Sequence, residues 1–242
     1  MSDAPKKLRK SGKKCFAKEH LQLGARLAKD TTKELLLQAG KKLFARKGLD
    51  GITVKDLATE AGVNVSLVSY YYQGKEGLYE ACLLECGRES LALSQRLLTP
   101  PLSSEDFHLR LQLFIDEMYE FFSKNQDHVR TLLREIESED SVFQRDYKEV
   151  FEETFLKVFI TLVEFFRGAQ KIGLIRKNLD PHLITVLFRG AMSQVVRTDF
   201  LSQRYYKMSL LEPKFREKTR NHLLEIFLQG ILVETTSSGI VK

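Results

Sequence analysis

The feature that most constrains the fold is a pair of short helical segments joined by four residues, 61-AGVN-64. The first segment begins after Thr53 and repeats apolar or small residues with the i, i+3, i+4, i+7 spacing of one helix face. Gly62 permits the positive φ of a tight turn, and the second segment ends near Tyr72. Two short helices joined by such a corner are typical of a helix-turn-helix.

The sequence also predicts helices throughout the rest of the chain after residue 29. A Thr31-x-x-Glu34 capping pattern predicts a helix from Thr31 to Gly48, and Asn64 or Ser66 caps the short helix that ends near Tyr72. Further helices are predicted over residues 75–98, 105–124, 127–138, 142–171, 181–200 and 213–235. No strand alternation or hairpin signal occurs, so the sequence predicts an all-α fold. We expect an arm over residues 1–29, a helix-turn-helix domain over 30–75 and a helical domain over 76–242.

The charge of the chain is concentrated in its first 29 residues. This segment carries nine Lys and Arg residues against two acidic ones, whereas the whole chain has a formal net charge of +6. Its repeated lysines and lack of apolar periodicity predict a disordered basic arm. Two interpretations stay open, a solubilising tail and an electrostatic aid to binding a polyanion such as DNA.

Several protein classes do not fit the composition. The most apolar stretch, residues 155–166, is short and interrupted by charged side chains, so we expect no membrane span. The absence of a signal-peptide pattern and of a disulfide framework predicts a cytoplasmic protein. Cys82 and Cys86 lie four residues apart, either as a redox pair or as two small buried side chains. No metal-ligand set, phosphate loop or nucleophile motif is present, so no enzyme, metal or cofactor is expected.

The order of these segments resembles the tetracycline repressor (TetR) family of transcriptional regulators. The residues that carry the resemblance are Phe44, Gly48, 52-ITV-54, Leu57, Ala58, 61-AGVNVSLVSYYYQGKEGLYEA-81 and, more weakly, 171-KIGLIRKNLDP-181. The resemblance implies a bacterial homodimer that binds a near-palindromic operator in double-stranded DNA and associates with the nucleoid when bound. It further implies a C-terminal ligand-binding and dimerisation domain, whose effector weakens DNA binding as in a repressor.

The resemblance also implies which residues meet DNA. The helix over residues 66–72 would enter the major groove, and the start of the helix after Thr53 would meet the backbone. The implied contact residues are Thr53, Lys55, Val65, Ser66, Leu67, Ser69, Tyr70, Tyr71 and Lys75.

Helical geometry separates the three consecutive tyrosines at positions 70 to 72. At about 100° per residue, Tyr70 faces outward, Tyr71 lies at the boundary where its hydroxyl reaches a phosphate, and Tyr72 faces the core. We expect the Tyr72 hydroxyl to reach the domain rim or a backbone carbonyl. The outward arc contains no arginine for bidentate guanine contacts, which predicts A·T content in each half-site.

The helical domain suggests an effector pocket and a dimer interface. The candidate pocket residues are apolar, with an arginine to meet an acidic group on a small apolar or amphipathic effector: Phe114, Met118, Phe155, Phe159, Leu162, Phe188, Met192 and either Arg134 or Arg189. The last two helices are apolar around most of their circumference, which favours a homodimer interface over helices central to a monomer. The alternative function is a DNA-binding regulator or nucleoid protein controlled by a protein partner without a small ligand.

Overall fold

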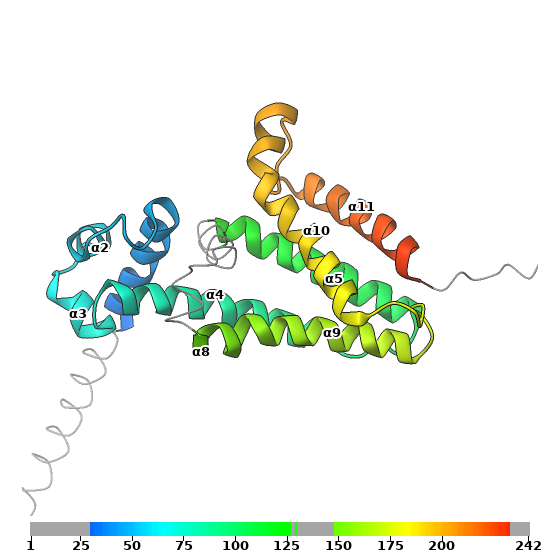
Figure 1. Ribbon diagram of the computed structural model, residues 1–242. Helices are drawn as coiled ribbons and strands as arrows, with labels where there is room; N and C mark the ends of the chain where they lie inside the picture. Colours follow the sequence, from blue (N-terminus) through cyan, green and yellow to red (C-terminus); the bar gives the residue numbers. More distant parts are fainter. Residues whose placement is uncertain (1–29, 127–128, 130–147, 233–242) are drawn as a thin grey trace, which may run out of the picture. The chain divides into compact units, whose positions relative to one another are not determined.

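The computed structural model describes residues 30–126, 129 and 148–232. All secondary-structure elements in these ranges are helices, and the one β-bridge joins Ile175 to Leu232 (Figure 1). The expected all-α fold is confirmed. The predicted arm, the predicted helix over 127–138 and the last residues of the predicted 213–235 helix lie outside the described ranges. No helix among the described residues is long and apolar enough to cross a membrane.

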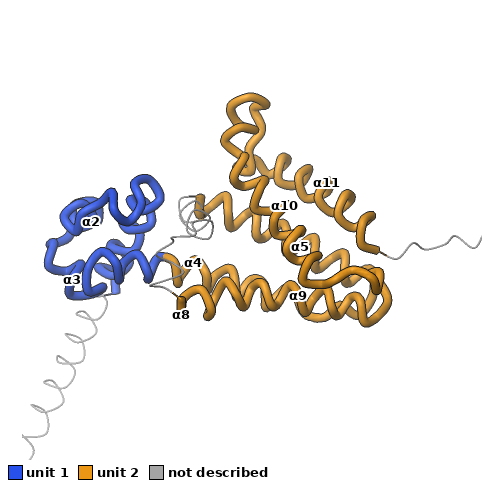
Figure 2. Tube along the Cα trace, in the orientation of Figure 1, with its two compact units in different colours: residues 1–82 blue, residues 83–242 orange. Residues whose placement is uncertain are grey.

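The chain forms two compact units, residues 1–82 and 83–242 (Figure 2). The sequence placed the domain boundary at residues 75 and 76, where α4 (Lys75–Leu97) begins. The first two turns of α4 belong to the first unit because Leu78, Tyr79 and Cys82 are buried there. The boundary between the two units therefore falls inside a helix, where no helix-terminating or turn residues mark it in the sequence.

The described part of the first unit contains a helix over residues 30–47, then α2 (Val54–Ala61), α3 (Ser66–Tyr72) and the start of α4. Its core is apolar, and the Phe44 and Tyr79 rings meet edge to face with centroids 4.9 Å apart. The first helix already includes Asp30, so the predicted start at Thr31 is wrong. Glu34, the expected partner in that cap, instead accepts a hydrogen bond from Gln38 at 2.6 Å.

The signals that delimit α2 and α3 are confirmed. Thr53 caps α2 in a capping box with Asp56, whose backbone N–H donates to Thr53 Oγ1 at 3.2 Å. Gly62 ends the helix with φ 66°, a conformation that costs a side-chain-bearing residue about 1–2 kcal/mol. Asn64 Oδ1 accepts from the Ser66 backbone N–H at 2.9 Å and so satisfies a free donor at the start of α3.

The described part of the second unit contains the rest of α4 and five further α-helical segments. They are α5 (Ser104–Lys124), α8 (Lys148–Val150), α9 (Leu156–Lys171), α10 (Pro181–Leu201) and α11 (Pro213–Ile231). Two π-helical turns, η1 (Phe151–Phe155) and η2 (Ser202–Tyr206), follow α8 and α10 directly. The predicted helix over 142–171 therefore contains a π turn, and the one predicted to end at 200 continues to Tyr206, where Lys207 turns it with φ 56°.

A cluster of phenylalanines forms the core of the second unit. Phe188 on α10 packs against Phe166 on α9 and Phe227 on α11, with ring centroids 5.6 Å and 5.1 Å apart. Phe107 on α5 stacks on Phe165 at 5.3 Å. Each aromatic ring buries a large apolar area, so this cluster stabilises the packing of four helices, α5, α9, α10 and α11.

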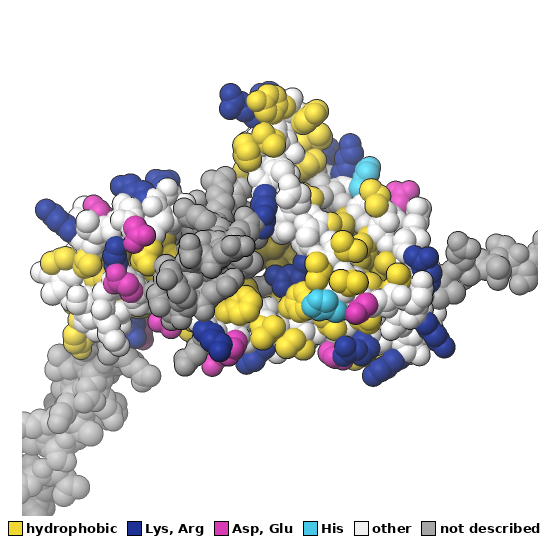
Figure 3. Space-filling model, viewed as in Figure 1, with side chains coloured by type: hydrophobic (Ala, Val, Ile, Leu, Met, Phe, Trp, Pro, Cys, Tyr) yellow, Lys and Arg dark blue, Asp and Glu magenta, His cyan; other side chains and the backbone are white. Residues whose placement is uncertain are grey.

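The second unit also exposes apolar side chains. Leu183, Val186 and Leu187 lie on the exposed side of α10, and Leu187 is 68% exposed. Hydrophobic side chains also gather at the end of α10 and in η2, at the top of Figure 3, where Phe200 and Tyr206 are exposed. On α11 the widely exposed large apolar residue is Ile226, at 74%. Leu228 and Ile231 of α11 are buried and, apart from Ile226, its other large apolar residues are partly buried, so α11 exposes fewer large apolar side chains than α10 does.

Candidate DNA-binding surface and effector cavity

One buried residue on the opposite side of α3 determines which side of this helix is exposed. Val68 is fully buried, whereas Ser66 and Ser69 are exposed and Tyr70 is 70% exposed. Of the residues expected to meet DNA, those lying exposed are Thr53, Lys55, Val65, Ser66, Ser69 and Tyr70, and those partly buried are Leu67, Tyr71 and Lys75. Six of the nine expected contact residues are therefore exposed to solvent, and three are partly buried.

The three tyrosines differ in their surroundings, as helical geometry predicted. The Tyr70 and Tyr71 rings meet edge to face with centroids 4.9 Å apart, so Tyr71 supports the ring of its exposed neighbour. The Tyr72 hydroxyl donates to the backbone carbonyl of Lys33 at 3.0 Å. This bond ties α3 to the first helix and confirms the expected role of the Tyr72 hydroxyl.

Lys75 has a structural function that the sequence did not reveal. Its ammonium donates to the carbonyl oxygens of Leu49 at 3.1 Å and Ile52 at 3.5 Å, and so holds the turn that precedes α2. An ammonium has three donors, so one N–H is left for a phosphate. Lys75 thus joins the start of α4 to the loop that positions Thr53.

Hydrogen bonds at the start of α2 also fix Thr53. Its hydroxyl donates to Asp56 Oδ2 at 2.7 Å, and its backbone N–H donates to the same oxygen at 2.8 Å. These bonds lower the pKa of the Asp56 carboxyl. The Thr53 hydroxyl proton is therefore used inside the domain, and Lys55, which is exposed, is the freer candidate for a contact with DNA.

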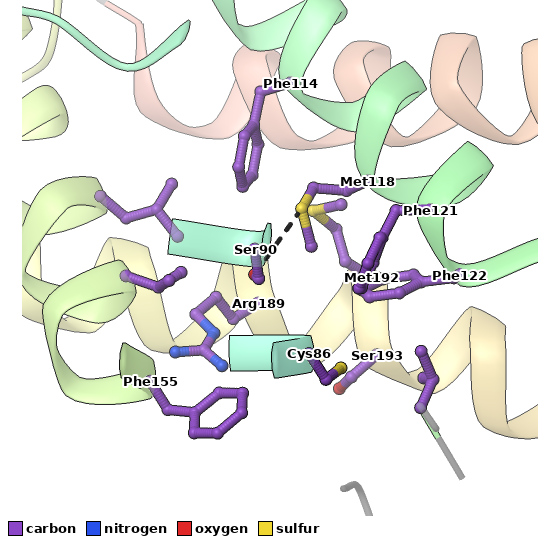
Figure 4. Close-up of a pocket in the computed structure, with 13 residues that line it drawn as sticks. Cys86, Ser90, Phe114, Met118, Phe121, Phe122, Phe155, Arg189, Met192 and Ser193 are labelled. Carbon is purple, nitrogen blue, oxygen red and sulfur yellow. Dashed lines mark hydrogen bonds between the residues drawn. The ribbon is translucent and has the colours of Figure 1, made fainter. Parts of the chain in front are cut away.

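The second unit contains an apolar cavity of about 70 Å³ (Figure 4). Its walls come from α4, α5, η1, α9 and α10. The lining residues are Cys86, Ser90, Phe114, Met118, Phe121, Phe122, Val129, Phe155, Val158, Leu162, Arg189, Met192 and Ser193. This composition fits the apolar body of a ligand together with a small polar or charged group.

The candidate pocket residues divide between the cavity and its surroundings. Those that line the cavity are Phe114, Met118, Phe155, Leu162, Met192 and Arg189. Phe188 belongs to the phenylalanine cluster instead, and Phe159 lies under the Arg189 guanidinium, whose Cζ is 5.8 Å from the ring centroid. Arg134 lies outside the described residues. Phe188 and Phe159 are therefore not among the residues that line this cavity.

The sequence also missed one wall of the cavity. Cys86 and Ser90 lie one turn apart on α4, which the sequence suggested only as a connection between domains. Both are small and buried, so this face of α4 leaves space that a larger side chain would fill. Small residues at that spacing were the available signal. Phe121, Phe122, Val129, Val158 and Ser193 complete the set of missed lining residues.

The π turn η1 brings Phe155 to the cavity. Thr154 and Phe155 are consecutive and both buried, and the Thr154 hydroxyl donates to the Val150 carbonyl at 2.6 Å. Gly87 on α4 allows this close packing, because a Cβ there would lie 2.4 Å from Thr154 Oγ1. Single π turns inside helices frequently occur at functional sites, and this one changes the helix register beside the cavity.

Among the described residues that line the cavity, Arg189 is the one that carries a charge. It is partly buried, and removal from water lowers the pKa of its guanidinium. The hydroxyl of Ser90 makes a weak contact with Met118 Sδ at 3.9 Å, shown dashed in Figure 4. Within the described ranges, no group of three or more His, Cys, Asp and Glu residues is placed to hold a metal ion.

An exposed α3 in a helix-turn-helix corner, followed by an all-helical unit, defines a DNA-binding protein of the transcriptional regulator class. Comparison with known proteins narrows this class. Residues 36–82 match the family model described as bacterial regulatory proteins, tetR family. The chain is 25% identical over 187 residues to a probable HTH-type transcriptional regulator, YttP, of Bacillus subtilis, covering 77% of this chain and 87% of that protein.

Two solved structures share the fold. FadR from Bacillus subtilis in complex with stearoyl-CoA matches with a TM-score of 0.66 at 16% identity, over 82% of this chain and 98% of that chain. SmeT, the repressor of a multidrug efflux pump of Stenotrophomonas maltophilia, matches with a TM-score of 0.63 at 15% identity, over 87% and 96%. Residues 36–82 therefore match the DNA-binding domain of the TetR family, and most of the chain is similar to transcriptional regulators.

Proposed function

We propose that this regulator is a dimeric repressor that a small apolar or amphipathic effector releases from its operator. The apolar cavity in the second unit carries this proposal. A regulator controlled only by a protein partner has no need for a cavity between its core helices, and well-packed interiors contain few voids larger than a water molecule. FadR from Bacillus subtilis, which has a similar fold, forms a complex with stearoyl-CoA, and this supports a ligand-binding role for the second unit.

The proposed DNA-binding surface consists of α3 and the start of α2. Ser66, Ser69 and Tyr70 project from α3, which carries no Arg or Lys in its sequence SLVSYYY. Serine hydroxyls and an aromatic edge contact thymine methyl groups, sugars and phosphates more readily than they make bidentate contacts with guanine. We therefore expect operator half-sites that contain A·T pairs.

The proposed homodimer uses the exposed side of α10, together with α11. Leu183, Leu187 and Gly190 follow each other at intervals of about one turn on α10. A Cβ added at Gly190 would meet nothing within 4 Å, so this position leaves room for a helix from a second copy. An exposed apolar stripe with such a gap suits close helix packing across a twofold axis.

The experiment that tests the proposal is a map of the binding sites of the full-length protein across its own genome, followed by footprinting of the strongest site. We expect two protected half-sites related by a dyad and about one helical turn apart. Extracts of small molecules from the same cells should then weaken the footprint. Sites without dyad symmetry would contradict the dimeric repressor, and a footprint that no small molecule changes would favour the partner-controlled alternative.

Tyr70→Ala is expected to weaken operator binding about tenfold, equivalent to about 1.4 kcal/mol, without a change in thermal stability. The side chain is exposed, so its removal costs the fold little, whereas contacts with sugar, phosphate or a thymine methyl would be lost. Titration of a labelled operator fragment measures the affinity. Tyr205→Ala is the matched control, because Tyr205 is 67% exposed but belongs to the second unit. Equal affinities for both variants would remove Tyr70 from the DNA-binding surface.

A further inference from the structure

Arg189 has no acidic partner among the described residues. No ion pair with it is present there, and burial lowers the pKa of its guanidinium. Moving a cation out of water is costly unless an anion and hydrogen-bond acceptors replace the water. Arginine nevertheless keeps its proton at neutral pH. Within the described ranges, the cavity therefore contains a positive charge that no acidic side chain balances.

The position of the guanidinium is defined by its neighbours. It lies over the Phe159 ring at 5.8 Å, within the range of a cation–π interaction. In Figure 4 it projects between Phe155 and the α4 residues Ser90 and Cys86. The ring of Phe159 is in turn met by His182 with centroids 5.2 Å apart. Phe159, although absent from the cavity lining, is thus a positioning residue for Arg189.

We propose that Arg189 binds the carboxylate of the effector, whose apolar body occupies the space between Met118, Met192 and the phenylalanines of the cavity. This inference rests on the proposed function, since it names the chemical class of the effector. A guanidinium and a carboxylate form two parallel hydrogen bonds, which are stronger than bonds between neutral groups. The hydroxyls of Ser90 and Ser193 add neutral donors to the lining.

The size and charge of the cavity narrow the class to small monocarboxylic acids. The one cation among the described lining residues balances one anionic group, whereas these residues would leave most of the charge of a ligand with several phosphates uncompensated. A volume of about 70 Å³ admits a short apolar chain only when side chains move. Met118 and Met192 are suited to such movement because their unbranched side chains adopt several conformations.

The experiment compares ligands that differ only in the head group. Straight-chain carboxylic acids of six, eight, ten and twelve carbons are titrated into the full-length protein by calorimetry at pH 7, alongside the primary alcohols of the same lengths. We expect at least one acid to bind ten times more tightly than its alcohol. Equal binding of acid and alcohol at every length, or no binding of any acid, overturns the proposal.

Variants of Arg189 assign the preference to this side chain. Arg189→Gln should reduce the acid-over-alcohol preference to less than threefold, while binding of the alcohol is retained. Arg189→Lys should restore part of the preference, because it keeps the charge but loses the bidentate geometry. Arg197→Gln is the matched control on the same helix, since Arg197 is exposed and does not line the cavity. A preference that survives in Arg189→Gln contradicts the proposal.

Operator binding separates this inference from the proposed function. An acid that binds through Arg189 but leaves operator affinity unchanged supports the carboxylate site and contradicts effector release. A neutral compound that releases the operator equally from wild type and Arg189→Gln supports effector release and contradicts the carboxylate site. Thermal unfolding of each variant is measured in parallel, and we expect Arg189→Gln to melt no lower than wild type because it removes a buried charge without a partner.

Discussion

Gly77→Ala is expected to destabilise the first unit strongly and to weaken operator binding. A Cβ at this position would lie 1.9 Å from the backbone carbonyl oxygen of Tyr72, far inside contact distance. The obstacle is backbone at the end of α3, so no side chain can rotate away to relieve the overlap. Either α3 or α4 must shift, and we expect a cost of about 3 kcal/mol or more in the free energy of unfolding.

A cost of this size is a large part of the stability of a small domain, which totals only about 5–15 kcal/mol. Differential scanning calorimetry and operator titration of the full-length protein measure both effects. Glu80→Ala is the control, because it places alanine at an exposed position of the same helix. A Gly77→Ala protein that melts and binds like wild type would show that the junction of α3 and α4 is not as tight as described.

The helix-turn-helix could be predicted from sequence because its limits depend on local chemistry. Thr53 and Asp56 cap α2, Gly62 provides the positive φ that ends it, and Asn64 caps α3, each through contacts within a few residues. The requirement for Gly77 was not predicted, since it depends on how closely the end of α3 approaches the first turn of α4. The structural role of Lys75 was not predicted either, because its bonds to Leu49 and Ile52 join segments more than twenty residues apart.

The sequence could predict which kinds of residue line the cavity, but not which individual residues do so. Helical periodicity indicates which side of a helix is buried, but not whether a buried ring meets a cavity or another ring. Phe114 and Phe188 have the same pattern in sequence, yet Phe114 lines the cavity and Phe188 fills the core with Phe166 and Phe227. The π turn before α9 adds a second difficulty, because it shifts the register that places Phe155.

Replacing Leu183 and Leu187 together by glutamate is expected to convert the dimer to monomers and to lower operator affinity by a factor of about 100 or more. The two leucines are 57% and 68% exposed on α10, one turn apart. In a twofold interface each carboxylate would be buried against apolar side chains and near its own symmetry mate. The loss in DNA binding follows because two linked domains bind two half-sites far more tightly than one domain binds one.

Sedimentation velocity of the full-length protein measures the oligomeric state, and titration of whole operators and single half-sites measures the DNA affinity. A variant that only loses dimerisation keeps wild-type affinity for an isolated half-site, because α3 belongs to the first unit and the substitutions to the second. Loss of half-site binding as well would indicate general unfolding instead. Leu109→Glu on α5, where the leucine is 54% exposed, introduces the same charge outside α10 and should stay dimeric. Dimers that persist with glutamate at both positions would place the interface elsewhere, and the apolar stripe of α10 would then need another partner.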